Sequence, residues 1–211
     1  MKKMVLVLTL AAFALSGSAF AQDPNWNDNI GTYLSPTGYI DPAGPGGSCG
    51  FMAPDELFTV YVVLSRLTNP EVHGWEAKIT TSNMTVLATT YHGQVLDVAE
   101  RDFEYIVGMS SPLFAVDNAV VVLELLCQVN STLNDPLQPS TIFIDGIFRS
   151  SINPNNGPPA YEATGTDTIV ELHPALGDPW DFEIPQLVIN GDCDPVGVEE
   201  STWGNVKSLY R

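Results

Sequence analysis

Basic residues are scarce in this 211-residue sequence, which has 8 lysines and arginines against 25 aspartates and glutamates and a formal net charge of −17. Such an acidic surface repels phosphate backbones and anionic lipid, which excludes nucleic-acid binding. Beyond the N-terminus, no stretch approaches the roughly 18 consecutive apolar residues of a membrane helix. Because 45% of the residues are hydrophobic, disorder is not expected. The sequence therefore predicts a soluble, acidic, globular protein without a transmembrane span in its mature chain.

Recognisable catalytic motifs are also scarce. The sequence has no His-Glu-x-x-His, no Cys-x-x-Cys and no glycine-rich phosphate loop. No two of the histidines His73, His92 and His173 share a metal-ligand spacing. Acidic residues are so numerous that two carboxylates at the spacing used by glycosidases would arise by chance. We therefore predict a protein that is not an enzyme and has no cofactor.

The first 21 residues have the three parts of a secretory signal peptide. Lys2 and Lys3 form a basic start, residues 5–15 an apolar run, and residues 19–21 an Ala-x-Ala cleavage site. We expect export to the periplasm, the cell surface or the extracellular space, with a mature chain that starts at Gln22. The signal holds two of the 8 basic residues and none of the 25 acidic ones, so the mature chain would carry a formal charge of −19.

Proline and glycine divide the mature sequence into three parts. Residues 22–50 are rich in both and predict an extended lead-in with at most one short strand, at 31–34. Residues 51–194 contain short β-branched and aromatic runs between turn residues, which predict one β domain. Residues 195–211 are a linker and a C-terminal tail. The strands predicted in the domain are 58–64, 75–80, 84–91, 103–109, 119–129, 141–147, 168–172 and 186–189.

Strands without intervening helices must bury their apolar faces against a second sheet, so the fold class is an all-β antiparallel sandwich or jelly roll. Both faces of 58–64 are apolar, which predicts a central strand. In 75–80, apolar residues alternate with Glu76, Lys78 and Thr80, which predicts one solvent-exposed face. Cys127 lies on the apolar face of 119–129 and is expected to be an inert buried thiol.

Three cysteines in an exported protein usually form one bridge and leave one thiol over. Cys49 precedes the first strong strand and Cys193 follows the last, so the two would meet if these strands are neighbours. We expect a Cys49–Cys193 disulfide, which would stabilise the fold by roughly 4 to 5 kcal/mol on the chain-entropy model. Three free thiols remain the alternative.

Two kinds of binding site are suggested by loop residues. Asn190, Asp192 and Asp194 offer oxygens at alternate positions, as the start of a calcium loop does, but Pro195 and Ser201 break the rest of that pattern. An ordinary acidic turn is therefore favoured over a structural calcium ion. Rings in breaker-rich segments can stack on sugars or cover a sheet end. The candidate binding residues of this kind are Trp180, Tyr161 and Tyr39.

The last nine residues, Trp203 to Arg211, carry two basic side chains and no acidic one. As a helix they would present Trp203, Val206, Leu209 and Tyr210 on one face. Residues 199–211, which include this segment, resemble the Thr-Trp-Gly…Lys…Leu-Tyr-Arg ending of many exported proteins of Gram-negative bacteria. This resemblance implies a sorting or attachment signal recognised by export machinery. A helix docked on its own domain is the alternative.

The strand order of residues 56–148 resembles that of cohesin-like and related carbohydrate-binding sandwich domains. The resemblance is carried by 58–64, by 73–79 with its Gly-Trp pair, by 84–87 with Gly93, and by the apolar strand at 121–125. It implies binding rather than catalysis. We therefore predict an exported, non-enzymatic β-sandwich that acts as a binding, adhesion or extracellular structural protein with a protein or polysaccharide partner. A carbohydrate-binding module and a secreted hydrolase without a recognisable motif are the alternatives.

Overall fold

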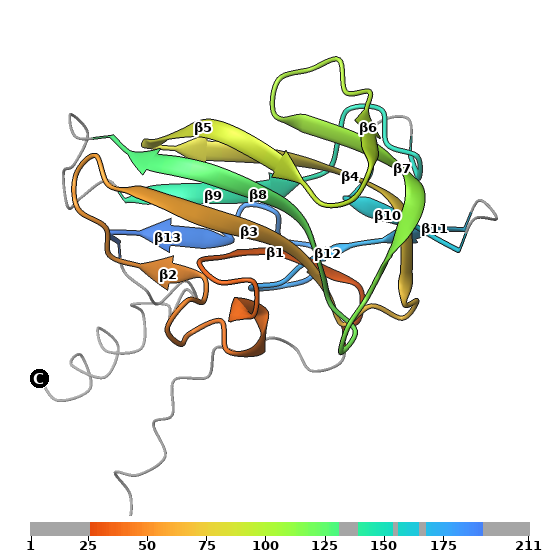
Figure 1. Ribbon diagram of the computed structural model, residues 1–211, viewed down its shortest axis with the longest axis horizontal. Coiled ribbons are helices and arrows are strands. Elements are labelled where there is room, and N and C mark those ends of the chain that lie inside the picture. Colours follow the sequence, from red (N-terminus) through yellow and green to blue (C-terminus); the bar gives the residue numbers. More distant parts are fainter. Residues whose placement is uncertain (1–25, 131–138, 154–155, 165–167, 192–211) are drawn as a thin grey trace, which may run out of the picture.

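The computed structural model describes residues 26–130, 139–153, 156–164 and 168–191, which form two β-sheets packed face to face (Figure 1). The smaller sheet contains, in spatial order, β12 (His173–Pro174), β1 (Asn29–Tyr33), β3 (Leu57–Ser65), β8 (Val120–Val129) and β5 (Met84–Tyr91). The larger sheet contains β11 (Thr168–Glu171), β10 (Ala160–Ala163), β4 (Glu71–Ser82), β9 (Ser140–Asp145), β13 (Leu187–Ile189) and β2 (Cys49–Gly50). The predicted all-β sandwich is confirmed.

Two further strands widen the larger sheet. β7 (Glu104–Phe114) pairs with β4 on the side opposite β10, and β6 (Val95–Asp97) pairs with β7. These strands lie with β10 and β11 at the right of Figure 1. No helix within the described residues is long and apolar enough to cross a membrane. The helical structure among them is the short 3-10 helix η1 (Gly38–Ile40).

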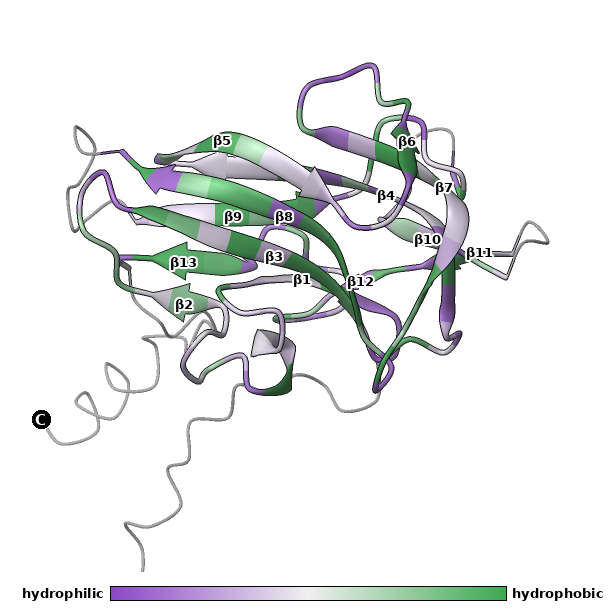
Figure 2. Cartoon of the chain, viewed as in Figure 1, coloured by the Kyte–Doolittle hydropathy of each residue, from purple (hydrophilic) through white to green (hydrophobic). Residues whose placement is uncertain are grey.

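The hydrophobic core lies between the sheets. β3 buries Phe58, Val60 and Val62 there, and β4 buries Trp75, Ala77 and Ile79, each below 9% exposed. These residues alternate with others that point away, because successive side chains of a strand point to opposite faces. Figure 2 shows apolar residues along β3, β8 and β13. As predicted, β3 is an inner strand, with β1 on one side and β8 on the other.

The proline- and glycine-rich lead-in is partly built into this sandwich. β1 pairs with β3 in antiparallel fashion and with β12 in parallel fashion. Ile30 and Tyr33 of β1 have no exposed surface, and Tyr33 packs against Val63 and Ala175 on the outer side of the smaller sheet. The β domain therefore includes residues that precede position 51.

The match between predicted and observed strands depends on strand length. β5 has the predicted bounds of 84–91, β3 is one residue longer than predicted at each end, and β8 begins one residue later than predicted. β7 continues five residues beyond the predicted end at 109. The strands that the sequence pattern missed have four residues or fewer: β2, β6, β10 and β12.

Cys127 is the free cysteine among the described residues, and it has no exposed surface. Burial raises the pKa of its thiol from 9.0 to about 12. We expect iodoacetamide to modify it slowly in the folded protein at pH 8 and rapidly in urea, because the thiolate is the reactive form. Rapid alkylation of the folded protein would contradict the predicted inert thiol.

The same burial gives a pH dependence of stability. A raised pKa in the folded state means that the thiol stabilises the fold fully below pH 9, and that this contribution is lost as pH rises from about 9 towards 12. The difference in free energy of unfolding between the wild type and Cys127→Ala should therefore shrink above pH 9. The buried tyrosines are present in both proteins, and Tyr105 is the one whose pKa Cys127 helps to raise, so the comparison reports on the thiol together with this coupling. Urea unfolding at pH 8 and at pH 10.5 measures it.

Candidate binding groove on the larger sheet

The outer face of the larger sheet is defined by β4 and its neighbours. Trp75, Val107 and Tyr161 point into the core, so the residues before and after each of them point outward. Cross-strand pairing arranges these outward residues in two rows: Gly108, Gly74 and Glu162 in one, and Ile106, Glu76 and Ala160 in the other. Leu96 of β6 continues the first row because it pairs with Gly108.

A groove of about 270 Å³ follows these rows. Its walls include Leu96, Val98 and Ile169, which are 68%, 54% and 39% exposed. The volume lies just below the roughly 300–1,000 Å³ of typical small-molecule sites. The groove is therefore sized for one or two side chains of a partner.

Two glycines in register form the floor. A Cβ atom on Gly74 would lie 2.8 Å from the carbonyl oxygen of Val107, a distance that real Cβ atoms essentially never show. At Gly108 a Cβ atom would meet no atom within 4 Å. Gly74 is thus needed for the close approach of β4 and β7, whereas Gly108 is open to the groove.

Glu76 lies in this groove but is buried, with 4% exposure. Its Oε1 accepts hydrogen bonds from the Ser150 hydroxyl at 2.8 Å and the Ser151 backbone amide at 2.7 Å, and its Oε2 accepts one from the Ser151 hydroxyl at 2.7 Å. The expectation that Glu76 faces solvent is wrong, because the segment around Ser150 covers it. A buried carboxylate needs such donors, and here it fixes that segment to β4.

We expect Glu76→Gln to destabilise the protein by about 1 kcal/mol, because the amide oxygen can keep two of the three donors but the charge-assisted part of each bond is lost and the Ser151 hydroxyl must turn to accept from the NH₂. Glu162→Gln is a matched control on the same face, since no hydrogen bond or ion pair of Glu162 occurs among the described residues, and its effect should be below about 0.5 kcal/mol. Urea unfolding of both variants measures the difference. Equal stabilities would show that the Glu76 network contributes nothing.

Glu162 differs from Glu76 in its surroundings. It is half-buried, and its Oε2 would lie 3.6 Å from a Cβ atom on Gly74, so the carboxylate sits over the glycine floor. The described residues form two ion pairs, Glu71–His73 and Glu124–His92, and neither includes Glu162.

A second hollow of about 300 Å³ adjoins the groove and shares Val98 and Ile106 with it. In this hollow the Arg101 guanidinium lies 3.7 Å from the centre of the Phe148 ring. The Phe148 amide donates to Glu104 Oε1 at 3.1 Å. Apolar and charged groups therefore alternate along one continuous surface.

Tyr161, a candidate for sugar stacking, is a core residue. It is 1% exposed, and its hydroxyl donates to Asp28 Oδ1 at 2.7 Å. The same carboxylate accepts hydrogen bonds from the backbone amide and the hydroxyl of Thr68. The Tyr161 ring therefore offers no face to a sugar in solvent. The expectation that Tyr161 is a loop residue available for sugar stacking is wrong.

The other two candidate rings are accessible and lie apart from the groove. Trp180 is 54% exposed, and its ring contacts His173 and Trp26 in edge-to-face geometry at 4.7 and 6.2 Å between centroids. Tyr39 is half-buried and lines a separate hollow of about 600 Å³ that also includes Arg66. The structure does not bring the three predicted rings into one row.

The predicted calcium loop is only partly described. Asn190 Oδ1 accepts a hydrogen bond from the Met52 amide, and Asn190 Nδ2 donates to the Met52 carbonyl, both at 2.9 Å. Asp192 and Asp194 lie outside the described residues, so the calcium site stays a prediction. Among the residues that are described, no group of three or more His, Cys, Asp or Glu side chains could hold a metal ion.

The predicted disulfide depends on the same end of the chain. β13 pairs with β2 in parallel, and Val188 lies opposite Cys49. The first and last strands of the larger sheet are thus neighbours, as the disulfide requires, but Cys193 lies outside the described residues.

We therefore expect Cys49→Ser and Cys193→Ser to lower the free energy of unfolding equally, by about 4 kcal/mol on the chain-entropy model. Cys127→Ser is not equivalent, because it places a hydroxyl in the core. A non-reducing peptide map tests the pairing directly. Alkylation of Cys49 without reductant would contradict the disulfide.

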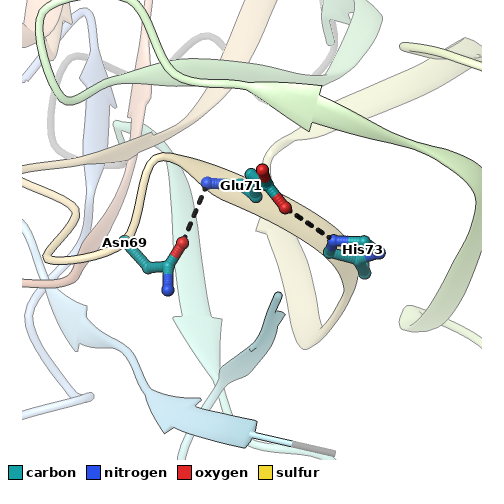
Figure 3. A network of polar contacts seen from close by, with 3 residues as sticks. All are labelled: Asn69, Glu71 and His73. Atoms are coloured by element: carbon teal, nitrogen blue, oxygen red, sulfur yellow. Dashed lines mark hydrogen bonds and ion pairs between the residues drawn. The ribbon is translucent and has the colours of Figure 1, made fainter. Parts of the chain in front are cut away.

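The histidines form separate contacts. Figure 3 shows His73 Nε2 at 3.1 Å from Glu71 Oε2, while the Asn69 side chain accepts a hydrogen bond from the Glu71 amide. His92 contacts Glu124, and His173 Nδ1 lies 3.2 Å from the Pro179 carbonyl oxygen. Each histidine has a different partner, in agreement with the absence of a shared ligand spacing.

One motif was missed in the sequence. Residues 46–50 read Gly-Gly-Ser-Cys-Gly, which is the Gly-x-Ser-x-Gly spacing of a hydrolase nucleophile. Ser48 is 3% exposed, and its hydroxyl donates to the Pro42 carbonyl at 3.0 Å. The serine is followed by β2 and not by the helix of a nucleophile elbow. Its hydroxyl therefore holds the loop.

No family model and no curated protein matches this sequence. Solved structures that superpose on the chain are cohesin modules. The sixth cohesin of scaffoldin B from Acetivibrio cellulolyticus, solved with a Cel5 dockerin mutant, is 12% identical with a TM-score of 0.49, over 79% of this chain and 100% of that one. The cohesin module of a family 33 glycoside hydrolase from Clostridium perfringens is 8% identical with a TM-score of 0.45, over 79% and 98%.

A third structure has similar values. The third ScaB cohesin of R. flavefaciens, in complex with a group 1 dockerin, is 9% identical with a TM-score of 0.45, over 80% of this chain and 98% of that one. These structures come from the class that the strand order of residues 56–148 resembles. The TM-scores lie below 0.5, so the likeness carries no conclusion about a ligand.

Proposed function

We propose that this protein is a non-enzymatic module that binds another protein through the groove on the outer face of its larger sheet. The main support for this proposal is the cluster of exposed apolar side chains in and beside the groove. Leu96, Val98 and Ile169 line the groove, and Phe148 lines the adjoining hollow at 42% exposure. A continuous apolar surface rimmed by charged residues is typical of protein-binding sites.

The groove fits this role better than it fits catalysis. Both oxygens of Glu76 accept hydrogen bonds from serine groups, so this carboxylate is engaged in holding the fold. The groove is shallow and small, and two of its walls come from strands that pair at the edge of the sheet. Such a surface receives side chains that project from a partner.

Sugar binding remains a second candidate function because Trp180 is 54% exposed. Its ring lies in the loop before β13, away from the groove, and it is buttressed by His173 and Trp26. A stacked sugar would contact the remaining free face of the indole. The two functions use different residues, so separate variants distinguish them.

The proposal includes export and surface attachment. Residues 1–21 would direct the chain out of the cytoplasm, and residues 203–211 would be recognised by sorting machinery. Both segments lie outside the described residues, and their support is the sequence alone. The cell surface, the periplasm and the extracellular space are the compartments in which the partner would be met.

Gly108→Trp is the sharpest test, because a Cβ atom at Gly108 meets no atom within 4 Å and the indole attached to it would occupy the groove. The wild-type protein, immobilised on a resin, should capture a partner from the secreted and surface proteins of the source cells. We expect Gly108→Trp to lower that capture at least tenfold, a loss of about 1.4 kcal/mol or more. Far-UV circular dichroism and thermal unfolding verify that the variant is folded.

Trp180→Ala is the matched control on the other surface. If the captured partner is a protein that Gly108→Trp loses and Trp180→Ala retains, the groove is the binding site. Retention of a polysaccharide that Trp180→Ala loses would instead establish the second candidate function. Unchanged capture by Gly108→Trp would overturn the proposal.

A further inference from the structure

The groove holds two carboxylates without a counter-ion among the described residues. Glu76 and Glu162 both line it, and they lie on adjacent rows of the same face. Neither takes part in an ion pair, because the two pairs that the described residues form use His73 and His92. Negative charge held beside apolar walls is poorly solvated, so a cation that enters the groove is favoured.

The basic residues Lys78, Arg101 and Arg149 lie near the groove but do not line it, and Arg101 and Arg149 line the adjoining hollow. Lys78 follows Glu76 on the same face of β4, and its cross-strand partners are Glu104 on β7 and Asp145 on β9. Arg101 lies over the Phe148 ring in the adjoining hollow. No lysine, arginine or histidine is among the residues that line the groove, so the cation we consider for it is one supplied by another molecule.

The walls and floor restrict the shape of that cation. Leu96, Val98 and Ile169 offer apolar surface at the rim, while Gly74 and Gly108 leave the floor without side chains. An aliphatic stem can lie across this floor, and its charged head can then reach the far side of the row, where Glu162 stands. Lysine and arginine side chains bury their methylenes on apolar surface while they keep the head polar.

We propose that the groove accepts a lysine or arginine side chain of the partner protein, with the stem on the apolar rim and the head against the Glu162 carboxylate. This inference rests on the proposed function. Glu76 contributes negative charge, but its oxygens are occupied by Ser150 and Ser151, so Glu162 is the direct contact. The net charge of −17 adds a general attraction for a basic partner.

The test uses the mature chain and a capped pentapeptide with one lysine between glycines. A second peptide replaces the lysine by norleucine, which keeps the aliphatic stem and lacks the ammonium group. NMR titration into the millimolar range should shift the Gly74 and Gly108 amides and the Ile169 methyl groups with the lysine peptide. We expect the norleucine peptide to bind at least fivefold more weakly.

Charge variants then separate a local contact from general attraction. Glu162→Gln should weaken binding of the lysine peptide roughly tenfold, the effect of losing a charge-assisted hydrogen bond. Glu183→Gln, in an exposed loop, removes the same charge elsewhere and should leave the affinity within twofold. Unlike Gly108→Trp, neither variant blocks the groove, so both report on the charge alone.

Equal binding of the two peptides, equal effects of Glu162→Gln and Glu183→Gln, or no shift at the groove with either peptide would each overturn this inference. The proposed function is tested separately, because Gly108→Trp would still abolish capture of a partner that docks by apolar contacts. If the groove binds the lysine peptide selectively but Gly108→Trp leaves capture unchanged, this inference holds and the proposed function is overturned.

Discussion

The larger sheet depends on burying the middle of β4, residues 74–77, on both faces although one face carries a carboxylate. One face packs Trp75, Ala77 and Ile79 against the smaller sheet. On the other, Glu76 would be costly to bury alone, and three hydrogen bonds from Ser150 and Ser151 make its burial tolerable. The strands on either side of β4 can then pair with it closely, and the groove is the space that remains between them.

A second buried carboxylate performs the corresponding task at the beginning of β1. Asp28 is 7% exposed and receives hydrogen bonds from Thr68 and Tyr161. Thr68 belongs to the connection between β3 and β4, and Tyr161 to β10. One side chain thus joins the start of the described chain to both sheets. Burial raises the pKa of the Tyr161 hydroxyl from 10.0 to about 12, so this donor keeps its proton above the pH at which an exposed tyrosine loses it.

The long strands and the sandwich could be predicted because a run of β-branched and aromatic residues is a local property. β3 and β5 contain such runs over seven residues or more, and their bounds were predicted to within one residue. The buried state of Glu76 could not be predicted, because its donors are 74 and 75 residues away in the chain. The alternation of apolar residues with Glu76, Lys78 and Thr80 predicted that Glu76 would face solvent. Similarly, Tyr161 lies among turn residues, and its burial depends on Asp28, 133 residues away.

The groove could not be predicted from the sequence either. It arises from the register that places Gly108 beside Gly74 and Gly74 beside Glu162, and two of the strands involved are too short to be recognised. Leu96 alone would count as an isolated surface leucine. Only the pairing of β6 with β7 shows that it forms one wall with Val98.

The parallel pairing of β1 with β12 and of β2 with β13 constrains how the protein can fold. During synthesis from the N-terminus the middle strands can pair early, but β1 lacks its parallel partner until residue 174 is available and β2 until residue 189. Such pairings between distant segments are slow, because the loop they close is long. We therefore expect these two parallel pairings to form late, once synthesis of the domain is nearly complete. A chain that must cross a membrane unfolded would benefit from that delay.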